Sequence, residues 1–328
     1  MPPTQTMTST ATPAHRVLVV DGDPAHLRWL SRITRSLLLD TDARDQLGEL
    51  DPGGAGHGLL LVNHDALTPV DRAALKELGR HGGAKPRLLF FSRASSGRTF
   101  EAFGDLEEFH AFGNLLGRDD VVDADELIVT LQKILRADPF GLEKYFAWGV
   151  ERVTLELTSS ADRARAISAA ETYASGLGLN PRLVSQFGSV VDELVTNAFY
   201  DAPVDASGKP RYAHYDRRID VTLEKDEHIR LTFCCDGRTL GISTSDPFGS
   251  LRRDQILASL SRCFRKGVDQ IDDKEGGAGL GLYVVFNALS QFIVNLQEGV
   301  QTEVIGLMDI RSRDAATRAK SLHIFTRS

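Results

Sequence analysis

The chain has 328 residues, a length that predicts two domains, each large enough to bury its own core. Its apolar share of 42% is that of a globular protein, and its net charge of −7 argues against nucleic acid as the main partner, because phosphate backbones attract basic surfaces. We find no apolar run of membrane-spanning length, no signal pattern at the start, and 3 cysteines in no disulfide or metal motif. We therefore expect a cytoplasmic protein without a membrane span.

The first part of the chain alternates short apolar runs with helical stretches. Residues 1–14, rich in Thr, Pro and Ala, are predicted to be a disordered lead-in. From there to residue 137 the predicted strands are 16–20, 59–62, 88–91 and 112–116, and the last predicted helix is 123–136. This alternation predicts a doubly wound parallel sheet with helices on both faces.

The segment 15–137 resembles a two-component receiver domain, which has a flavodoxin-like fold. It departs from that pattern where a receiver does its chemistry. The first strand is followed by Asp21 and Asp23 with a glycine between them, and the phosphate-accepting aspartate corresponds to Asn63. Asp65 is a weak substitute, and Arg118 is the cation nearest to the place of the usual lysine. We predict a pseudo-receiver that takes no phosphoryl group and serves as a docking or dimerising surface; a plain α/β scaffold is the alternative.

A linker with clustered aromatic residues is predicted at 138–151. It contains Tyr145, Phe146 and Trp148, whose large side chains are expected to be removed from water. Packing between the two domains is the interpretation that we prefer, and an exposed partner site is the alternative.

The remainder reads as a second α/β domain at 152–310, followed by a basic tail at 311–328 that could add an edge strand or dock elsewhere. The helix predicted to begin at Pro181 carries Glu193 and Asn197 four residues apart, so both polar side chains leave the same side of the helix. A carboxylate can take a proton or orient water, and an amide oxygen suits Mg²⁺. The other predicted elements are strands at 152–157, 219–223, 229–234, 240–244, 292–296 and 303–310, and helices at 160–175 and 251–264.

A glycine-rich segment, Gly276-Gly277-Ala278-Gly279-Leu280-Gly281, precedes an apolar helical run. Glycines allow close approach of another group, and a helix N-terminus offers free N–H groups that suit phosphate. The segment lacks the Lys-Ser/Thr of a P-loop and the context of a dinucleotide fingerprint.

These two stretches together resemble the GHKL ATPase superfamily (gyrase, heat-shock chaperone, histidine kinase and mismatch-repair ATPases). Glu193-x-x-x-Asn197 is similar to its N-box, in the form found in anti-sigma-factor serine kinases, and the stretch from Gly277 to Leu282 is similar to its second glycine box. The resemblance implies a two-layer α/β sandwich with a mixed sheet that binds ATP and Mg²⁺. It implies that Glu193 is the catalytic base, that Asn197 holds Mg²⁺, and that Gly277, Gly279, Leu280 and Gly281 contact the phosphates.

The same resemblance implies an aspartate that accepts a hydrogen bond from the amine of adenine. Two candidates stand in the sequence, Asp236-Gly237 and Asp246-Pro247-Phe248-Gly249. We choose Asp246 with Gly249, because Asp246 ends a predicted strand and a helix follows, whereas Asp236 is explained by turn chemistry. A polar stretch at 262–275 resembles the mobile lid of such sites.

The resemblance therefore implies a signalling protein, and a serine/threonine kinase acting on a regulatory partner protein is the activity that we expect. Self-phosphorylation on histidine is not expected, because no histidine occurs between Asp138 and Leu194. A catalytically inactive, nucleotide-gated interaction module is the alternative. A dimeric ATP-driven clamp is a weaker one, and a homodimer stays open.

Overall fold

The computed structural model describes residues 16–48, 57–80, 87–92, 113–117, 123–266, 280–311 and 321–327. The chain divides into two compact units, one of residues 1–91 with 111–113 and one of residues 92–110 with 114–328. Within the described ranges no helix is long and apolar enough to cross a membrane.

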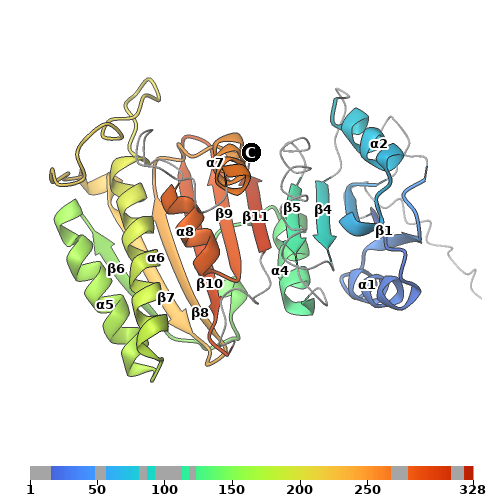
Figure 1. Ribbon diagram of the computed structural model, residues 1–328, viewed down its shortest axis with the longest axis horizontal. Coiled ribbons are helices and arrows are strands. Elements are labelled where there is room, and N and C mark those ends of the chain that lie inside the picture. Colours follow the sequence, from blue (N-terminus) through green and yellow to red (C-terminus); the bar gives the residue numbers. More distant parts are fainter. Residues whose placement is uncertain are drawn as a thin grey trace, which may run out of the picture. The chain divides into compact units, whose positions relative to one another are not determined.

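The first unit is built on a parallel sheet in the order β2-β1-β3-β4, of which Figure 1 labels β1 and β4. Helix α1 connects β1 to β2 in one direction along the sheet, and α2 connects β3 to β4 in the other. Because such crossovers are right-handed, the two helices cover opposite faces, which confirms the doubly wound arrangement. The elements are β1 (Arg16–Val20), α1 (Pro24–Ser36), β2 (Asp40–Arg44), β3 (Leu59–Asn63), η2 (His64–Ala66), α2 (Pro69–Arg80) and β4 (Arg87–Ser92).

Strand β2 is absent from the sequence prediction. Its residues Asp40–Arg44 are polar except for Ala43 and are at most partly buried, as suits a strand at the end of this sheet that pairs with β1. An edge strand of this composition carries no hydrophobic alternation from which it could be recognised.

The second unit contains a mixed sheet in the order β5-β11-β9-β10-β8-β7-β6. Strand β11 runs parallel to β9 and antiparallel to β5, and the other neighbouring pairs are antiparallel. The mixed sheet confirms the predicted fold class. The strands are β5 (Gly113–Gly117), β6 (Arg152–Leu157), β7 (Ile229–Cys235), β8 (Thr239–Asp246), β9 (Gln291–Gln297), β10 (Gln301–Asp309) and β11 (Ser321–Arg327).

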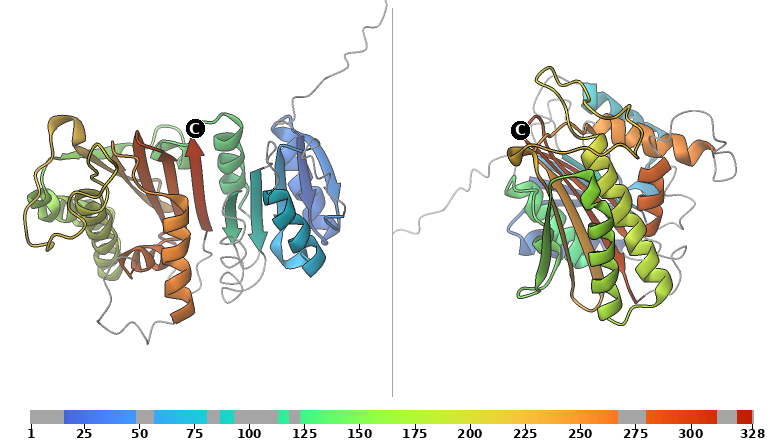
Figure 2. Two further views of the ribbon diagram at one scale, coloured as in Figure 1. Left: turned by 90° about the horizontal axis from the view of Figure 1, so that it is seen from above. Right: turned by 90° about the vertical axis from the view of Figure 1, so that its left-hand side faces the viewer.

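Helices α5, α6 and α8 lie over one face of this sheet, and α4 lies on the other with the 3-10 turn η3 (Figure 2). The helix-bearing face holds the predicted site, so we call the opposite one the linker face. The helices are α4 (Ala124–Leu135), α5 (Arg163–Gly176), α6 (Pro181–Tyr200), α7 (Arg253–Lys266) and α8 (Leu280–Ala288), and the 3-10 turns are η3 (Leu142–Tyr145), η4 (Ser160–Asp162) and η5 (Lys225–Glu227).

One local prediction is wrong: residues 219–223 form no strand, and Thr222 makes only an isolated bridge to Ser159. Ser159 caps the helical turn that leads into α5, and the Ser160 hydroxyl accepts a hydrogen bond from the N–H of Val221 at 2.9 Å. The tail, left open by the sequence, forms strand β11, which pairs with β9 on one side and β5 on the other.

The predicted linker packs on the linker face of the second unit. Tyr145 and Phe146 lie against a buried cluster that includes Leu142, Ile305 and Phe325. Gly241 permits this, because a Cβ at that position would overlap the Phe146 ring. Trp148 is different: its side chain is fully exposed, at 102%, so the expectation that all three aromatic residues leave the water is wrong for this one.

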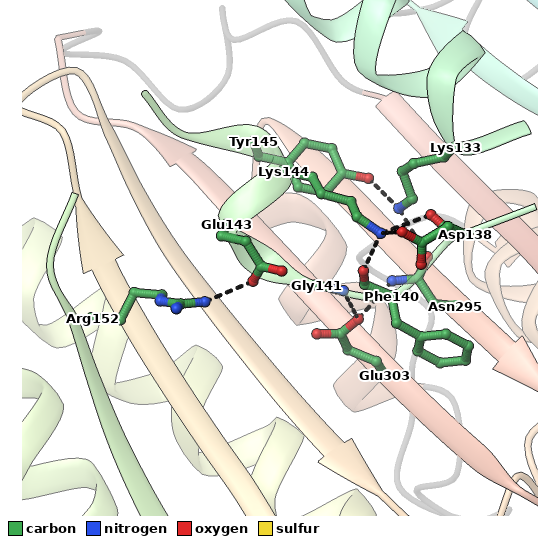
Figure 3. A network of polar contacts seen from close by, with 10 residues as sticks. All are labelled: Lys133, Asp138, Phe140, Gly141, Glu143, Lys144, Tyr145, Arg152, Asn295 and Glu303. Carbon is green, nitrogen blue, oxygen red and sulfur yellow. Dashed lines mark hydrogen bonds and ion pairs between the residues drawn. The ribbon is translucent and has the colours of Figure 1, made fainter. Parts of the chain in front are cut away.

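A buried polar network joins α4 to this face (Figure 3). Lys133, 3% exposed, donates hydrogen bonds to the Tyr145 hydroxyl at 2.5 Å and to Asn295 Oδ1 at 3.0 Å. Asn295 and the N–H of Gly141 donate in turn to Glu303 Oε2, at 2.9 and 2.8 Å. Helix α4 and residues 114–117 of strand β5, predicted at the end of the first domain, belong to the second compact unit.

Candidate functional site

Helix α6 carries the predicted polar pair. Asn180 caps it by accepting a hydrogen bond from the N–H of Leu183 at 3.0 Å, and Pro181 occupies its first turn, where a missing N–H is tolerated. The buried face of the helix includes Phe187, Val191 and Leu194, which fix its rotation against the sheet. Glu193 and Asn197 are consequently half-buried on one side of the helix.

The side chains of Glu193 and Asn197 are joined by a hydrogen bond. Burial raises the pKa of the Glu193 carboxyl, and the neighbouring Asp192 and Asp201 add to the rise, while the hydrogen bond to Asn197 and the charge of Arg217 oppose it. The preceding Asp192 is different, because Arg163 pairs with it, donating from Nη2 to Oδ2 at 2.8 Å. The raised pKa of Glu193 is shifted toward the range in which a general base works.

Gly281, in the first turn of α8, lies directly against Glu193. A Cβ at position 281 would overlap the carboxyl carbon and both oxygens of Glu193. Helices α6 and α8 are neighbours along this stretch. The structure thus brings together Glu193 and Gly281, which lie 88 positions apart in the sequence. The carboxylate of Glu193 therefore lies at the first described turn of α8.

Asp246 ends β8 and is buried, with 6% of its side chain exposed. It accepts hydrogen bonds from the N–H groups of Phe248, at 3.0 Å, and Gly249. Burial nevertheless raises its pKa to about 7. A buried carboxyl that titrates near neutrality is unusual in a purely structural role, so Asp246 is a candidate for ligand binding.

Gly249 fixes the turn that follows Asp246. Its φ is +56°, a conformation that favours glycine, and a Cβ there would overlap the carbonyl oxygen of Gln297 and the N–H of Val300. The N–H of Gly299 donates to the Gly249 carbonyl at 3.0 Å. The turn is therefore clamped against the β9–β10 hairpin.

The two parts of the site meet at the end of α6. The hydroxyl of Ser250 donates to the carbonyl of Ala202 at 2.6 Å. The N–H of Ala202 in turn donates to the Asn197 carbonyl at 3.0 Å. The turn after Asp246 and the helix end after Asn197 are thus linked through a single hydrogen-bonded residue, Ala202.

Two threonines beside Asp246 were not predicted. Thr302 on β10 is the register partner of Asp246, and Thr244 stands two residues before it on β8, so all three side chains share a face. Both threonines are buried, and neither hydroxyl has a hydrogen-bond partner among the described residues. A buried hydroxyl without a partner costs about 1–3 kcal/mol, which a polar ligand would offset. The sequence alternation could have paired Thr244 with Asp246, but Thr302 needed the register.

Asp236, the other candidate for base recognition, is engaged locally. Its Oδ1 accepts hydrogen bonds from the N–H groups of Arg238 and Thr239, at 2.9 and 2.7 Å, and so closes the β7–β8 hairpin. Turn chemistry accounts for this residue.

Several predicted positions cannot be placed. Gly277 and Gly279, and with them the lid from residue 267 onward, lie outside the described residues, as does Arg118. Leu280 is the first residue of α8. The described ranges contain no cluster of three or more His, Cys, Asp or Glu that could hold a metal ion.

The receiver-like edge of the first unit is closed by protein groups. Asp21, 1% exposed, forms an ion pair with His26 and accepts a hydrogen bond from Asn63 Nδ2 at 3.1 Å. Asn63 Oδ1 accepts from the N–H of Asp65 at 2.9 Å. An imidazole and an amide thus occupy both oxygens of the carboxylate that a receiver would use to hold a metal ion.

Comparisons with known proteins add little. No family model matches the sequence, and no curated protein is similar to it. Among solved structures the chain is similar to a putative pilus assembly-related protein from Burkholderia pseudomallei, with 18% identity over 38% of this chain and 93% of that chain, and a TM-score of 0.28. At this TM-score the likeness carries no argument.

Proposed function

We propose that the second unit binds ATP with Mg²⁺ and that the protein is a cytoplasmic signalling kinase that phosphorylates a serine or threonine of a regulatory partner. One observation carries the proposal: the carboxylate of Glu193 lies against the Cα of Gly281, at the N-terminus of α8. A glycine there leaves room for a carboxylate and a backbone-bound phosphate in one place. The ATP site is assigned by the resemblance of its motifs to those of GHKL ATPases, and membership of that family is part of the proposal.

We assign adenine recognition to the buried polar cluster of Asp246, Thr244 and Thr302 at the end of β8. Asp246 would accept a hydrogen bond from the exocyclic amine, and Thr302 and Thr244 offer hydroxyls that have no partner among the described residues. Guanine carries a carbonyl oxygen at the equivalent position, which would face the carboxylate. We therefore expect selectivity for ATP over GTP of about tenfold or more, because a mismatched buried polar group costs about 1–3 kcal/mol.

The transfer itself needs a base, an electrostatic clamp and alignment. Glu193 would accept the proton of the serine or threonine hydroxyl. The hydroxyl oxygen would bond to the terminal phosphorus of ATP while the bond from that phosphorus to the ADP oxygen breaks. The raised pKa of Glu193 suits this step. Asn197, held by its hydrogen bond to Glu193, would help to hold Mg²⁺, which supplies charge neutralisation to the phosphates when bound. The first N–H groups of α8 would position the phosphates.

Two measurements test this proposal. Calorimetric titration with a non-hydrolysable ATP analogue, with and without Mg²⁺, should show metal-dependent binding, and GTP should compete weakly. Turnover of ATP in the presence of candidate partners should fall by a factor of about 10² or more in Glu193→Ala. Binding without any difference in turnover between wild type and Glu193→Ala would eliminate the kinase.

A nucleotide-gated interaction module is the second candidate. The closed Asp21–His26–Asn63 cluster favours it, because the first unit has lost the groups that a receiver needs for phosphorylation. On this alternative both units serve recognition, and ATP changes partner binding without being consumed. The partner-binding affinity measured with and without the non-hydrolysable analogue distinguishes it from the kinase.

A further inference from the structure

A loop arginine stands beside the proposed site, and neither the resemblance nor the comparisons assign it a role. Glu193, Asn197 and Asp201 follow one another at four-residue spacing, so they form a stripe along one side of α6. Asp201 lies about 6 Å along the helix axis from Asn197, at a rise of 1.5 Å per residue. At this end of the stripe Arg217 Nη2 donates to Asp201 Oδ1 at 2.9 Å and Oδ2 at 3.1 Å.

The position of Arg217 is fixed from two further sides. Its guanidinium carbon lies 4.7 Å from the centre of the Tyr200 ring, and Tyr200 itself is buried, with 1% exposed. The Tyr200 hydroxyl donates to the carbonyl oxygens of Arg217, at 3.0 Å, and Ile219, at 2.8 Å. The loop backbone and the guanidinium are therefore both held by the last turn of α6.

One end of this guanidinium has no partner. Nη1 of Arg217 is buried, yet it has no hydrogen-bond acceptor among the described residues. Its charge nevertheless acts on the site, since it lowers the pKa of Glu193 against the effect of burial. A loop anchor needs only the Asp201 pair and the Tyr200 contact, and a buried donor without an acceptor is destabilising.

We propose that Arg217 binds the outer phosphates of the nucleotide through Nη1. Glu193 and Asp201 make the stripe acidic, and a triphosphate would add further negative charge, so a cation is needed beside them. A guanidinium held by Asp201 at one nitrogen and offering another is suited to a phosphate oxygen. This inference rests on the proposed nucleotide site and adds to it a residue that selects for the triphosphate.

The test compares three nucleotides. Affinities for AMP, ADP and a non-hydrolysable ATP analogue are measured by calorimetry with Mg²⁺ for the wild-type chain, Arg217→Ala and Arg217→Lys. We expect Arg217→Ala to weaken binding of the ATP analogue by about tenfold or more, the loss typical of one charge-assisted hydrogen bond, and to leave AMP binding within twofold. Arg217→Lys should fall between, because one ammonium cannot serve both Asp201 and a phosphate with the same geometry.

Arg218 provides the matched control. It is the next residue of the same loop, its side chain is 89% exposed, and it pairs with Asp216 at 2.7 Å. Arg218→Ala should leave all three affinities unchanged.

The AMP measurement separates the outcomes. Equal losses for AMP, ADP and the ATP analogue in Arg217→Ala would show an anchoring role only and would overturn the proposal, as would unchanged affinities for all three. A wild-type chain that binds none of the three nucleotides would instead overturn the proposed function, and the inference with it.

Discussion

The Cα of Gly281 lies against the carboxylate of Glu193, across two helices that are joined by more than 75 residues of chain. No side chain fits between them. This relationship places the acid of the sequence motif at a helix N-terminus, and it makes the site sensitive to a single methyl group.

Gly281→Ala should destabilise the second unit by about 1–3 kcal/mol, because the added methyl displaces the carboxylate or α8. The double variant Glu193→Ala/Gly281→Ala should recover most of this loss, since the shorter side chain makes room. Urea denaturation of the wild type, both single variants and the double variant gives the coupling free energy. Gly176→Ala is the control, because a Cβ there meets no atom within 4 Å. Additive single effects would mean that the two residues do not touch.

Asn197→Ala should remove the Mg²⁺-dependent part of nucleotide affinity, about tenfold or more, and leave the fold intact. The measurement is the ratio of affinities for the non-hydrolysable analogue with Mg²⁺ and with a chelator. Ser189 lies on the exposed side of the same helix, so Ser189→Ala should keep the affinity ratio of the wild type. If Asn197→Ala retains the full ratio, the metal ligand lies elsewhere.

Asp246 should make both stability and binding depend on pH near neutrality. Its pKa rises from the usual 3.8 to about 7, so its contribution to stability is full below about pH 4 and is lost as the pH rises through 7. Asp246→Asn should therefore be more stable than the wild type at pH 8, by about 1–3 kcal/mol, but not at pH 4. Urea denaturation at both pH values measures this.

The affinity for the adenine nucleotide should depend on pH in the opposite direction from stability: it should be higher above pH 7 than below it. A carboxylate accepts a hydrogen bond from the amine more strongly than a protonated carboxyl or an amide does, so wild-type affinity for the ATP analogue should fall as the pH drops below 7, and that of Asp246→Asn should be weaker than wild type at pH 8 and independent of Asp246 titration. A wild-type affinity that is flat between pH 6 and 8 would remove Asp246 from base recognition.

Lys133 should be a strong determinant of stability on the linker face. Burial holds its pKa well below the usual 10.5, so its contribution to stability is full above pH 10.5 and declines as the pH falls through the folded value. Lys133→Ala should cost about 2–4 kcal/mol, because it leaves a cavity and removes the donor to Tyr145 and Asn295. Lys133→Met should cost less and weaken the pH dependence. Arg152→Ala, which breaks the half-exposed pair with Glu143, should stay within about 1 kcal/mol.

His26→Ala should destabilise the first unit near neutral pH. Burial opposes ionisation of Asp21, but hydrogen bonds from His26, the N–H of Asp23 and Asn63 outweigh it and lower its pKa. That contribution is full above about pH 4 and is lost as the pH falls through the folded value, so the cost of His26→Ala, about 1–3 kcal/mol, should shrink at pH 3. Fluorescence of Trp29, which stacks on His26 with ring centres 5.3 Å apart, follows the transition.

Incubation with acetyl phosphate should label no residue of this unit.

The sequence by itself determined the elements whose signals are local. The sequence predicts strand Arg16–Val20 and the start of helix Pro181–Tyr200 within a few residues. Their signals, an apolar run, helical spacing and an Asn-Pro start, lie in neighbouring positions of the chain. The same local reading put Glu193 and Asn197 on one side of a helix.

Tertiary structure decided what depends on distant partners. The polar strand Asp40–Arg44 forms by pairing with β1. Residues 219–223 form no strand: Thr222 makes only an isolated bridge, and the N–H of Val221 donates to the Ser160 hydroxyl. Burial gave Asp246 its raised pKa, strand register placed Thr302 beside it, and the packing of α8 on α6 set Gly281 against Glu193. Desolvation and register are properties of the whole sheet, and no stretch of sequence contains them.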